Sequence, residues 1–104
     1  MREMRYLEAM REGLREEMLR DDAVFVLGED LRNSVRGLTK GLFQEFGATR
    51  VYETPISEAG FTGLATGAAI AGMRPVVEYQ INALVFVAFD QLVDQAQKLR
   101  YMMG

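Results

Sequence analysis

The sequence predicts an α/β fold: part of a doubly wound parallel sheet with helices on both faces. Three short apolar runs predict strands at residues 23–27, 50–53 and 75–79. Their centres lie near residues 25, 51 and 77, and a helical pattern fills each interval. Evenly spaced strands separated by helices are the pattern of stacked βαβ units.

The chain begins with an amphipathic helix over residues 6–20, which the pair Asp21-Asp22 ends. The apolar residues of this helix recur at helical spacing: Leu7, Met10, Leu14 and Met18. The run AVFVL at 23–27, closed by Gly28, predicts a buried strand. A polar loop is expected over residues 29–36.

The second unit contains a helix over residues 38–46, which Gly47 stops. The strand at 50–53 follows and Pro55 breaks it. Ser57 is then placed to cap a third helix over residues 58–71.

The last part of the chain predicts a strand at 75–79 and a long helix to residue 103. Pro75 stands at the first strand position, where proline is tolerated. The final helix has an apolar stripe, expected to be core: Phe89, Leu92, Val93, Ala96, Leu99 and Met103. Since a three-stranded parallel sheet is thin, we expect more sheet to follow and interpret 1–104 as the N-terminal portion of one domain.

Composition excludes several classes of function. The 104 residues include no cysteine and no histidine, which excludes disulfides, thiolate or histidine metal ligands and histidine-dependent catalysis. The net charge of −3 gives no sign of nucleic-acid binding. No apolar run reaches the roughly 20 residues of a membrane span, and the N-terminus lacks the apolar core of a secretory signal. We expect a cytoplasmic protein.

Three carboxylates are candidate functional groups. Glu29 and Glu58 follow the first and second strands, at the edge where open α/β sheets bind ligands. Glu29 is equally compatible with a solvated loop, and Glu58 with a first-turn position that the helix dipole favours. Glu78 lies inside an apolar strand run, where an edge position or a salt bridge would explain it. Asp90 is explained by its place near a helix start.

The helix at 58–71 is rich in small residues. Gly60, Gly63 and Gly67 fall roughly on one face, although each interior glycine costs about 0.5–1 kcal/mol relative to alanine. Either tight packing on the sheet or close approach of another helix, a cofactor or a partner subunit accounts for this. The glycines match neither a dinucleotide-binding fingerprint nor a Walker A sequence.

Short segments in a fixed order extend along the chain: YLEA at 6–9, VLGED at 26–30, TKGL at 39–42, TPISEAGF at 54–61, GAA at 67–69, GMRPVVE at 72–78, AFDQ at 88–91 and KLRYM at 98–102. Together they resemble the β subunit of the decarboxylating component of 2-oxoacid dehydrogenase complexes, of the pyruvate, branched-chain and acetoin type. TPISEAG is the most specific segment. The resemblance implies a transketolase-like, thiamine-diphosphate-binding fold, truncated within its pyrimidine-binding domain.

The resemblance also implies roles for individual residues. Glu58 would be catalytic and contact ring nitrogen N1′ of the thiamine aminopyrimidine, where a shared proton activates the cofactor. Ile56 would line the same ring. Leu84 stands where the family often has an aromatic residue, and leucine can still pack on the ring face. Glu29 and Asp90 match acids of a buried channel proposed to connect two active sites.

The implied partners are an α subunit that holds the pyrophosphate and its Mg²⁺, a second β subunit in a heterotetramer, the acyltransferase core and a 2-oxoacid substrate, most simply pyruvate. No metal site is expected in this chain itself. Family β subunits continue well beyond KLRYM, so this chain would carry half of a split site and be inactive alone. Two alternatives stay open: another transketolase-like enzyme, or a non-catalytic α/β module that dimerises through the small-residue helix.

Overall fold

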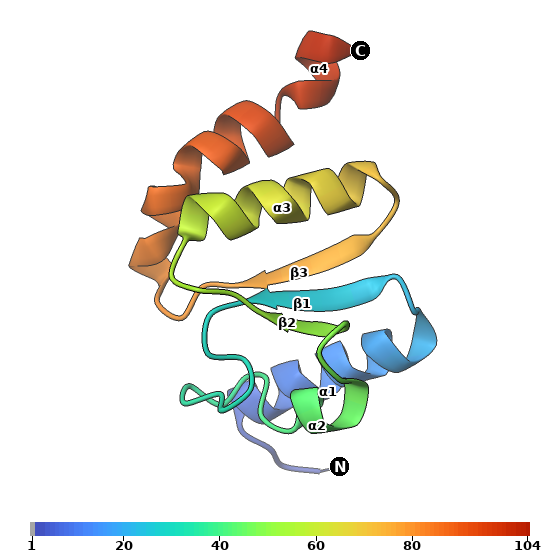
Figure 1. The fold of residues 1–104 in the computed structure, drawn as a ribbon. Coiled ribbons are helices and arrows are strands. Elements are labelled where there is room, and N and C mark those ends of the chain that lie inside the picture. Colours follow the sequence, from blue (N-terminus) through green and yellow to red (C-terminus); the bar gives the residue numbers. More distant parts are fainter. Residues whose placement is uncertain (1) are drawn as a thin grey trace.

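The computed structural model describes residues 2–104 and places a three-stranded parallel sheet between two layers of helices (Figure 1). In chain order the elements are α1 (Tyr6–Arg20), β1 (Val24–Gly28), α2 (Leu42–Phe46), β2 (Val51–Glu53), α3 (Glu58–Ile70), β3 (Arg74–Glu78), a 3₁₀ helix η1 (Asn82–Ala88), a π-helix η2 (Asp90–Ala96) and α4 (Leu99–Met103). The strand order is β2-β1-β3, and the predicted fold class is confirmed.

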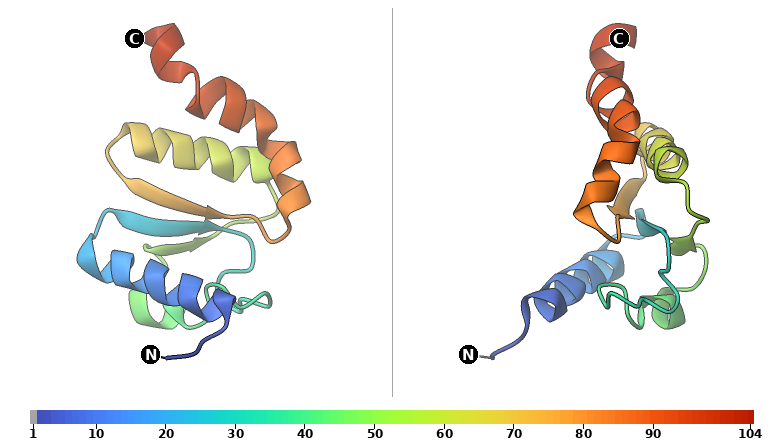
Figure 2. Two further views of the ribbon diagram at one scale, coloured as in Figure 1. Left: turned by 180° about the vertical axis from the view of Figure 1, so that it is seen from behind. Right: turned by 90° about the vertical axis from the view of Figure 1, so that its left-hand side faces the viewer.

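Both faces of the sheet are covered, which explains why β1 is an uninterrupted apolar run. Helices α1 and α2 lie on one face, and α3 lies with η1 and η2 on the other (Figures 1 and 2). All five residues of β1 are buried, because successive side chains point alternately into the two layers. No helix within residues 2–104 combines the length and the apolar character required to cross a membrane.

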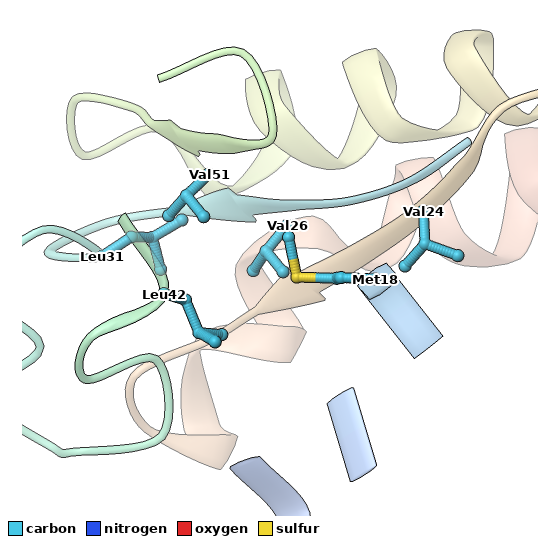
Figure 3. Close-up of a cluster of buried hydrophobic side chains, with 6 residues drawn as sticks. All are labelled: Met18, Val24, Val26, Leu31, Leu42 and Val51. Atoms are coloured by element: carbon cyan, nitrogen blue, oxygen red, sulfur yellow. The ribbon is translucent and has the colours of Figure 1, made fainter. Parts of the chain in front are cut away.

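Two apolar clusters form the core. The first lies between the sheet and α1 and α2 and contains Met18, Val24, Val26, Leu31, Leu42 and Val51 (Figure 3). The second lies between the sheet and α3 and contains Phe25, Leu27, Phe61 and Ala65. Each large side chain buried in this way contributes about 1.5–3 kcal/mol to folding.

Arg50 ties the start of the sheet to α1. Its guanidinium donates hydrogen bonds to the carbonyl oxygens of Val24, at 2.9 Å, and Met18, at 2.7 Å. The sequence shows it only as a charged residue at the start of a predicted strand, although its contacts join three parts of the chain.

The second helix is shorter than predicted. It begins at Leu42, not at residue 38, because Gly41 has a left-handed backbone with φ of 85° that a continuous helix cannot contain. Residues before it form a loop in which the Thr39 hydroxyl donates to the Leu31 carbonyl oxygen at 3.1 Å. Gly47 ends the helix as predicted.

The predicted side-chain cap on α3 is wrong. Ser57 occupies the N-cap position, but its hydroxyl donates backwards to the Pro55 carbonyl oxygen at 3.0 Å and makes no hydrogen bond to the helix. The helix nevertheless begins at Glu58, and Gly72 follows its end with φ of 99°.

The predicted single helix over 89–103 is also wrong. The segment divides into η2 and α4, preceded by η1, and η2 has the wider turn of a π-helix, with the Gln97 amide donating to the Leu92 carbonyl oxygen. Over seven residues the apolar spacing of the two helix types is too similar for a sequence to separate them. The apolar stripe is not core in this chain, because η2 and α4 contain no buried residue.

Another helix approaches the small-residue face of α3 closely at one point. A side chain at Gly63 would place its Cβ 3.0 Å from the Gln91 side-chain oxygen of η2, whereas no atom lies within 4 Å of the corresponding position at Gly67. Of the two explanations left open for this face, close approach of another helix therefore applies at Gly63, where η2 of the same chain lies.

Candidate functional site

The three strands end at one edge of the sheet, where loops from distant parts of the chain meet (Figure 1). The amide of Thr54, just after β2, donates to the Gly28 carbonyl oxygen at 2.8 Å. The Gln80 side chain, just after β3, donates to the Glu29 carbonyl oxygen at 2.7 Å. Ligands of open α/β sheets bind beyond this carboxyl edge.

Glu29 and Glu58 come together here, as their positions after successive strands predict. Glu58 is the first residue of α3 and is only 7% exposed, whereas Glu29 is half-buried in the loop after β1. Burial raises the pKa of Glu29 above its usual range. The neighbouring Glu58 carboxylate raises that pKa further, by charge repulsion and as the acceptor for a proton on Glu29, while the Ser57 backbone amide acts in the opposite direction.

Buried oxygen atoms without a hydrogen-bond partner gather at this edge. Within residues 2–104 they are Glu29 Oε1, Thr54 Oγ1 and Glu78 Oε2. Each such atom costs about 1–3 kcal/mol when it has no partner, so native proteins keep few of them. Glu29 and Thr54 follow adjacent strands, so two of these atoms lie at the edge where open α/β sheets bind ligands.

The other residues assigned by resemblance lie on nearby elements. Ile56 is in the loop that leads to Glu58 and is 81% exposed. Leu84 is half-buried in η1, which packs against α3. Their contact with a cofactor ring stays a prediction.

Asp90 is not buried in this chain. It lies exposed at the start of η2, and a hydrogen bond with Asp94 raises its pKa. Its link to Glu29 through a channel therefore stays a prediction. Within residues 2–104, no three acidic side chains converge in a way that would hold a metal ion.

Glu78 is a further buried acid at this edge of the sheet. It is 8% exposed and forms no salt bridge within residues 2–104. Burial, and then the nearby charge of Asp30, raise its pKa to about 7, against the hydroxyl of Thr39, which lowers it. The signal in the sequence is one acid inside the apolar run PVVEY.

Residues 2–104 match the family described as "Transketolase, pyrimidine binding domain". Several similar proteins are named as β subunits of oxidoreductases. The chain is 48% identical over 99 residues to the pyruvate dehydrogenase E1 component subunit beta of Rickettsia felis (strain ATCC VR-1525 / URRWXCal2), covering 93% of this chain and 30% of the relative.

Two relatives from Bacillus subtilis (strain 168) differ in name. The acetoin:2,6-dichlorophenolindophenol oxidoreductase subunit beta is 41% identical over 111 residues, covering 93% of this chain and 32% of the relative. The 2-oxoisovalerate dehydrogenase subunit beta is 42% identical over 100 residues, covering 94% of this chain and 31% of the relative. The chain thus spans about a third of the length of these relatives. With the family match over residues 2–104, these similarities show that the chain belongs to the transketolase pyrimidine-binding domain family.

Proposed function

We propose that this chain supplies the pyrimidine half of a thiamine-diphosphate site, as the N-terminal portion of the β subunit of a 2-oxoacid dehydrogenase of the pyruvate type. The observation that carries the proposal is that Glu58, buried within the most specific segment TPISEAG, lies beside the half-buried Glu29 at the carboxyl edge of the sheet. The relatives named as pyruvate dehydrogenase subunits favour pyruvate among 2-oxoacids.

The residues at this edge fit an aminopyrimidine. Glu58 offers a carboxyl group in a largely desolvated place, where a hydrogen bond to a ring nitrogen is stronger than in water. Thr54 Oγ1 and Glu29 Oε1 lack partners, and Ile56 presents an exposed apolar surface. Thiamine diphosphate, when bound, supplies the carbon nucleophile that decarboxylation of a 2-oxoacid requires.

The chain's own residues would position the ring and manage one proton. Glu58 would orient the pyrimidine and hold a proton between its carboxyl group and N1′. Glu29 keeps its proton to higher pH than an ordinary glutamate, so it can return a proton to Glu58 without opening the site to water. Ile56 and Leu84 would exclude water from the two sides of the ring.

The remaining parts of the site would come from partners. An α subunit would hold the pyrophosphate and Mg²⁺, and a second β subunit would complete a heterotetramer that passes acyl groups to an acyltransferase core. Such a complex would be cytoplasmic in a bacterium.

Hydrogen–deuterium exchange at C2 of the thiazolium tests the role of Glu58. In the full-length protein with its α subunit, Glu58→Ala should slow exchange by on the order of 10²-fold or more while the fold is preserved. Glu78→Gln is the matched control, because it changes another buried carboxyl group at the same edge and should leave exchange within a few-fold of wild type. Exchange at the wild-type rate in the Glu58→Ala variant would refute the assignment.

A further inference from the structure

A second concave site lies on the opposite face of the sheet from α3. It is a cavity of about 380 Å³ between the first turns of α1 and the loop that follows β1. Both ribbon views place this loop beside the N-terminal end of α1 (Figures 1 and 2). Three basic side chains line the cavity, Arg5, Arg11 and Lys40, together with one acid, Glu8.

The basic residues of this cavity differ from most others in the chain. Seven of the twelve lysines and arginines lie within 4.0 Å of a carboxylate. The five without such a partner, all within residues 2–104, are Arg5, Arg11, Arg36, Lys40 and Arg100. Three of these five line one cavity, although acids outnumber bases in the chain by 15 to 12.

Arg11 is held in place without being neutralised. Its Nε and Nη2 atoms donate to the Gly37 carbonyl oxygen at 2.9 and 2.5 Å, and its side chain is half-buried. A neutral carbonyl leaves the positive charge uncompensated, and three of the five guanidinium N–H groups stay available. Because the side chain is already ordered, a ligand would lose little conformational entropy in using it.

We propose that this cavity binds a phosphate group, held by Arg5, Arg11 and Lys40. The three cations and Glu8 give the lining a net charge of two positive units, which matches a doubly charged phosphate better than a single carboxylate. The planar guanidinium of Arg11 suits a tetrahedral oxyanion, and Lys40 contributes a point charge. The phosphate is either free or carried as the monoester of a small molecule.

Isothermal titration calorimetry of the full-length protein with inorganic phosphate at low salt tests the proposal. We expect saturable binding that weakens about tenfold or more in Arg11→Gln and in Lys40→Gln. Arg36→Gln is the matched control, since Arg36 is an unpaired arginine of the same loop that does not line the cavity, and it should change the Kd less than twofold. Titration with glycerol phosphate distinguishes the sources, because tighter binding than phosphate indicates a monoester and weaker binding indicates the free ion.

Lys40→Gln keeps the test decisive if Arg11→Gln fails to fold, since the Lys40 side chain is exposed and makes no hydrogen bond within residues 2–104. Circular dichroism should show that this variant melts as the wild type does. Absence of saturable binding of either ligand up to about 20 mM would overturn the proposal. Equal weakening by Lys40→Gln and Arg36→Gln would also overturn it, because it would show diffuse attraction and not a site.

Discussion

Replacing Glu78 with glutamine should stabilise the protein at pH 8 and leave its stability nearly unchanged at pH 4. Glu78 is 8% exposed, its Oε2 atom has no partner, and the charge of Asp30 lies nearby. All three features disfavour the ionised carboxylate. Glutamine has nearly the same size and removes the charge, so it should relieve this cost wherever the wild-type side chain would be ionised.

The size and sign of this change in stability follow from the pKa of Glu78 in the folded and unfolded states. The ordinary pKa of glutamate is 4.5, and that of Glu78 in the folded protein is about 7. Well below pH 4.5 the group is protonated in both states and costs nothing. As pH rises from 4.5 to 7 the unfolded chain releases its proton first, so stability falls, and above pH 7 the full cost is present. A difference of about 2.5 pKa units, at about 1.4 kcal/mol per unit, corresponds to about 3 kcal/mol, which solvent at the sheet edge reduces to about 2 kcal/mol.

Urea unfolding of wild type and Glu78→Gln at pH 4, 6 and 8 measures this cost. The two free energies of unfolding should agree at pH 4 and separate progressively at higher pH. Asp30→Asn should reduce the separation at pH 8, because it removes the nearby charge and lowers the pKa of Glu78. Asparagine tolerates the φ of 50° at this position and can still accept from the Val35 amide. Parallel pH profiles for wild type and Glu78→Gln would refute the reasoning.

Two further predictions concern glycines. Gly28→Ala should cost about 2–4 kcal/mol in thermal or urea unfolding, because the new Cβ would lie 2.5 Å from the Glu78 carbonyl oxygen at φ of 150°. Gly13→Ala is its control: no atom lies within 4 Å, and the helix interior should gain about 0.5–1 kcal/mol, so equal effects of the two changes would contradict the packing argument. Gly63→Leu should displace Gln91 and cost about 1–3 kcal/mol, measured the same way, and an unchanged stability would show that η2 moves aside freely.

The fold could be predicted from the sequence because its main signals are local. The three strand runs, the 3.6-residue spacing of α1, and Gly47 and Gly72 after their helices depend on neighbours a few residues away. They agree with one another, and such agreement across levels is what makes a sequence specify one fold.

The predictions fail where a distant contact or the backbone conformation determines the local structure. Gly41 could have lain inside a helix by composition, but its left-handed backbone delays α2. Ser57 has the residue type of an N-cap, yet its hydroxyl donates to the Pro55 carbonyl oxygen instead. Residues 89–103 have an apolar spacing that fits either an α-helix or a π-helix, so the sequence does not show the division into η2, which packs against α3, and α4.

The candidate site was predictable in part for a topological reason. Parallel strands deliver their following loops to one edge, so Glu29 and Glu58 could be expected to meet from their positions alone, and the structure brings them together. The burial of Glu78 depends instead on β3 pairing with β1, where Gly28 lies opposite it and leaves no side chain in between. That pairing joins residues 50 apart in sequence, and no local pattern encodes it.

The arrangement at the sheet edge also implies a conflict between stability and chemistry. Glu29 and Glu78 are held at the ends of strands, where burial disfavours the ionised form and raises each pKa, and Glu58 is buried at the start of α3. Apolar side chains there would make a more stable sheet, but they could not take the proton-handling roles proposed for Glu29 and Glu58. Strained or unsatisfied groups of this kind persist where the surrounding structure is rigid enough to retain them. Here that rigidity comes from β1, buried on both faces, to which Thr54 and Gln80 attach the neighbouring loops through backbone oxygens.

Neutralising Glu78 should therefore strengthen the fold without slowing cofactor activation, whereas removing Glu58 should slow activation while the fold is preserved. Measuring both variants separates the two roles.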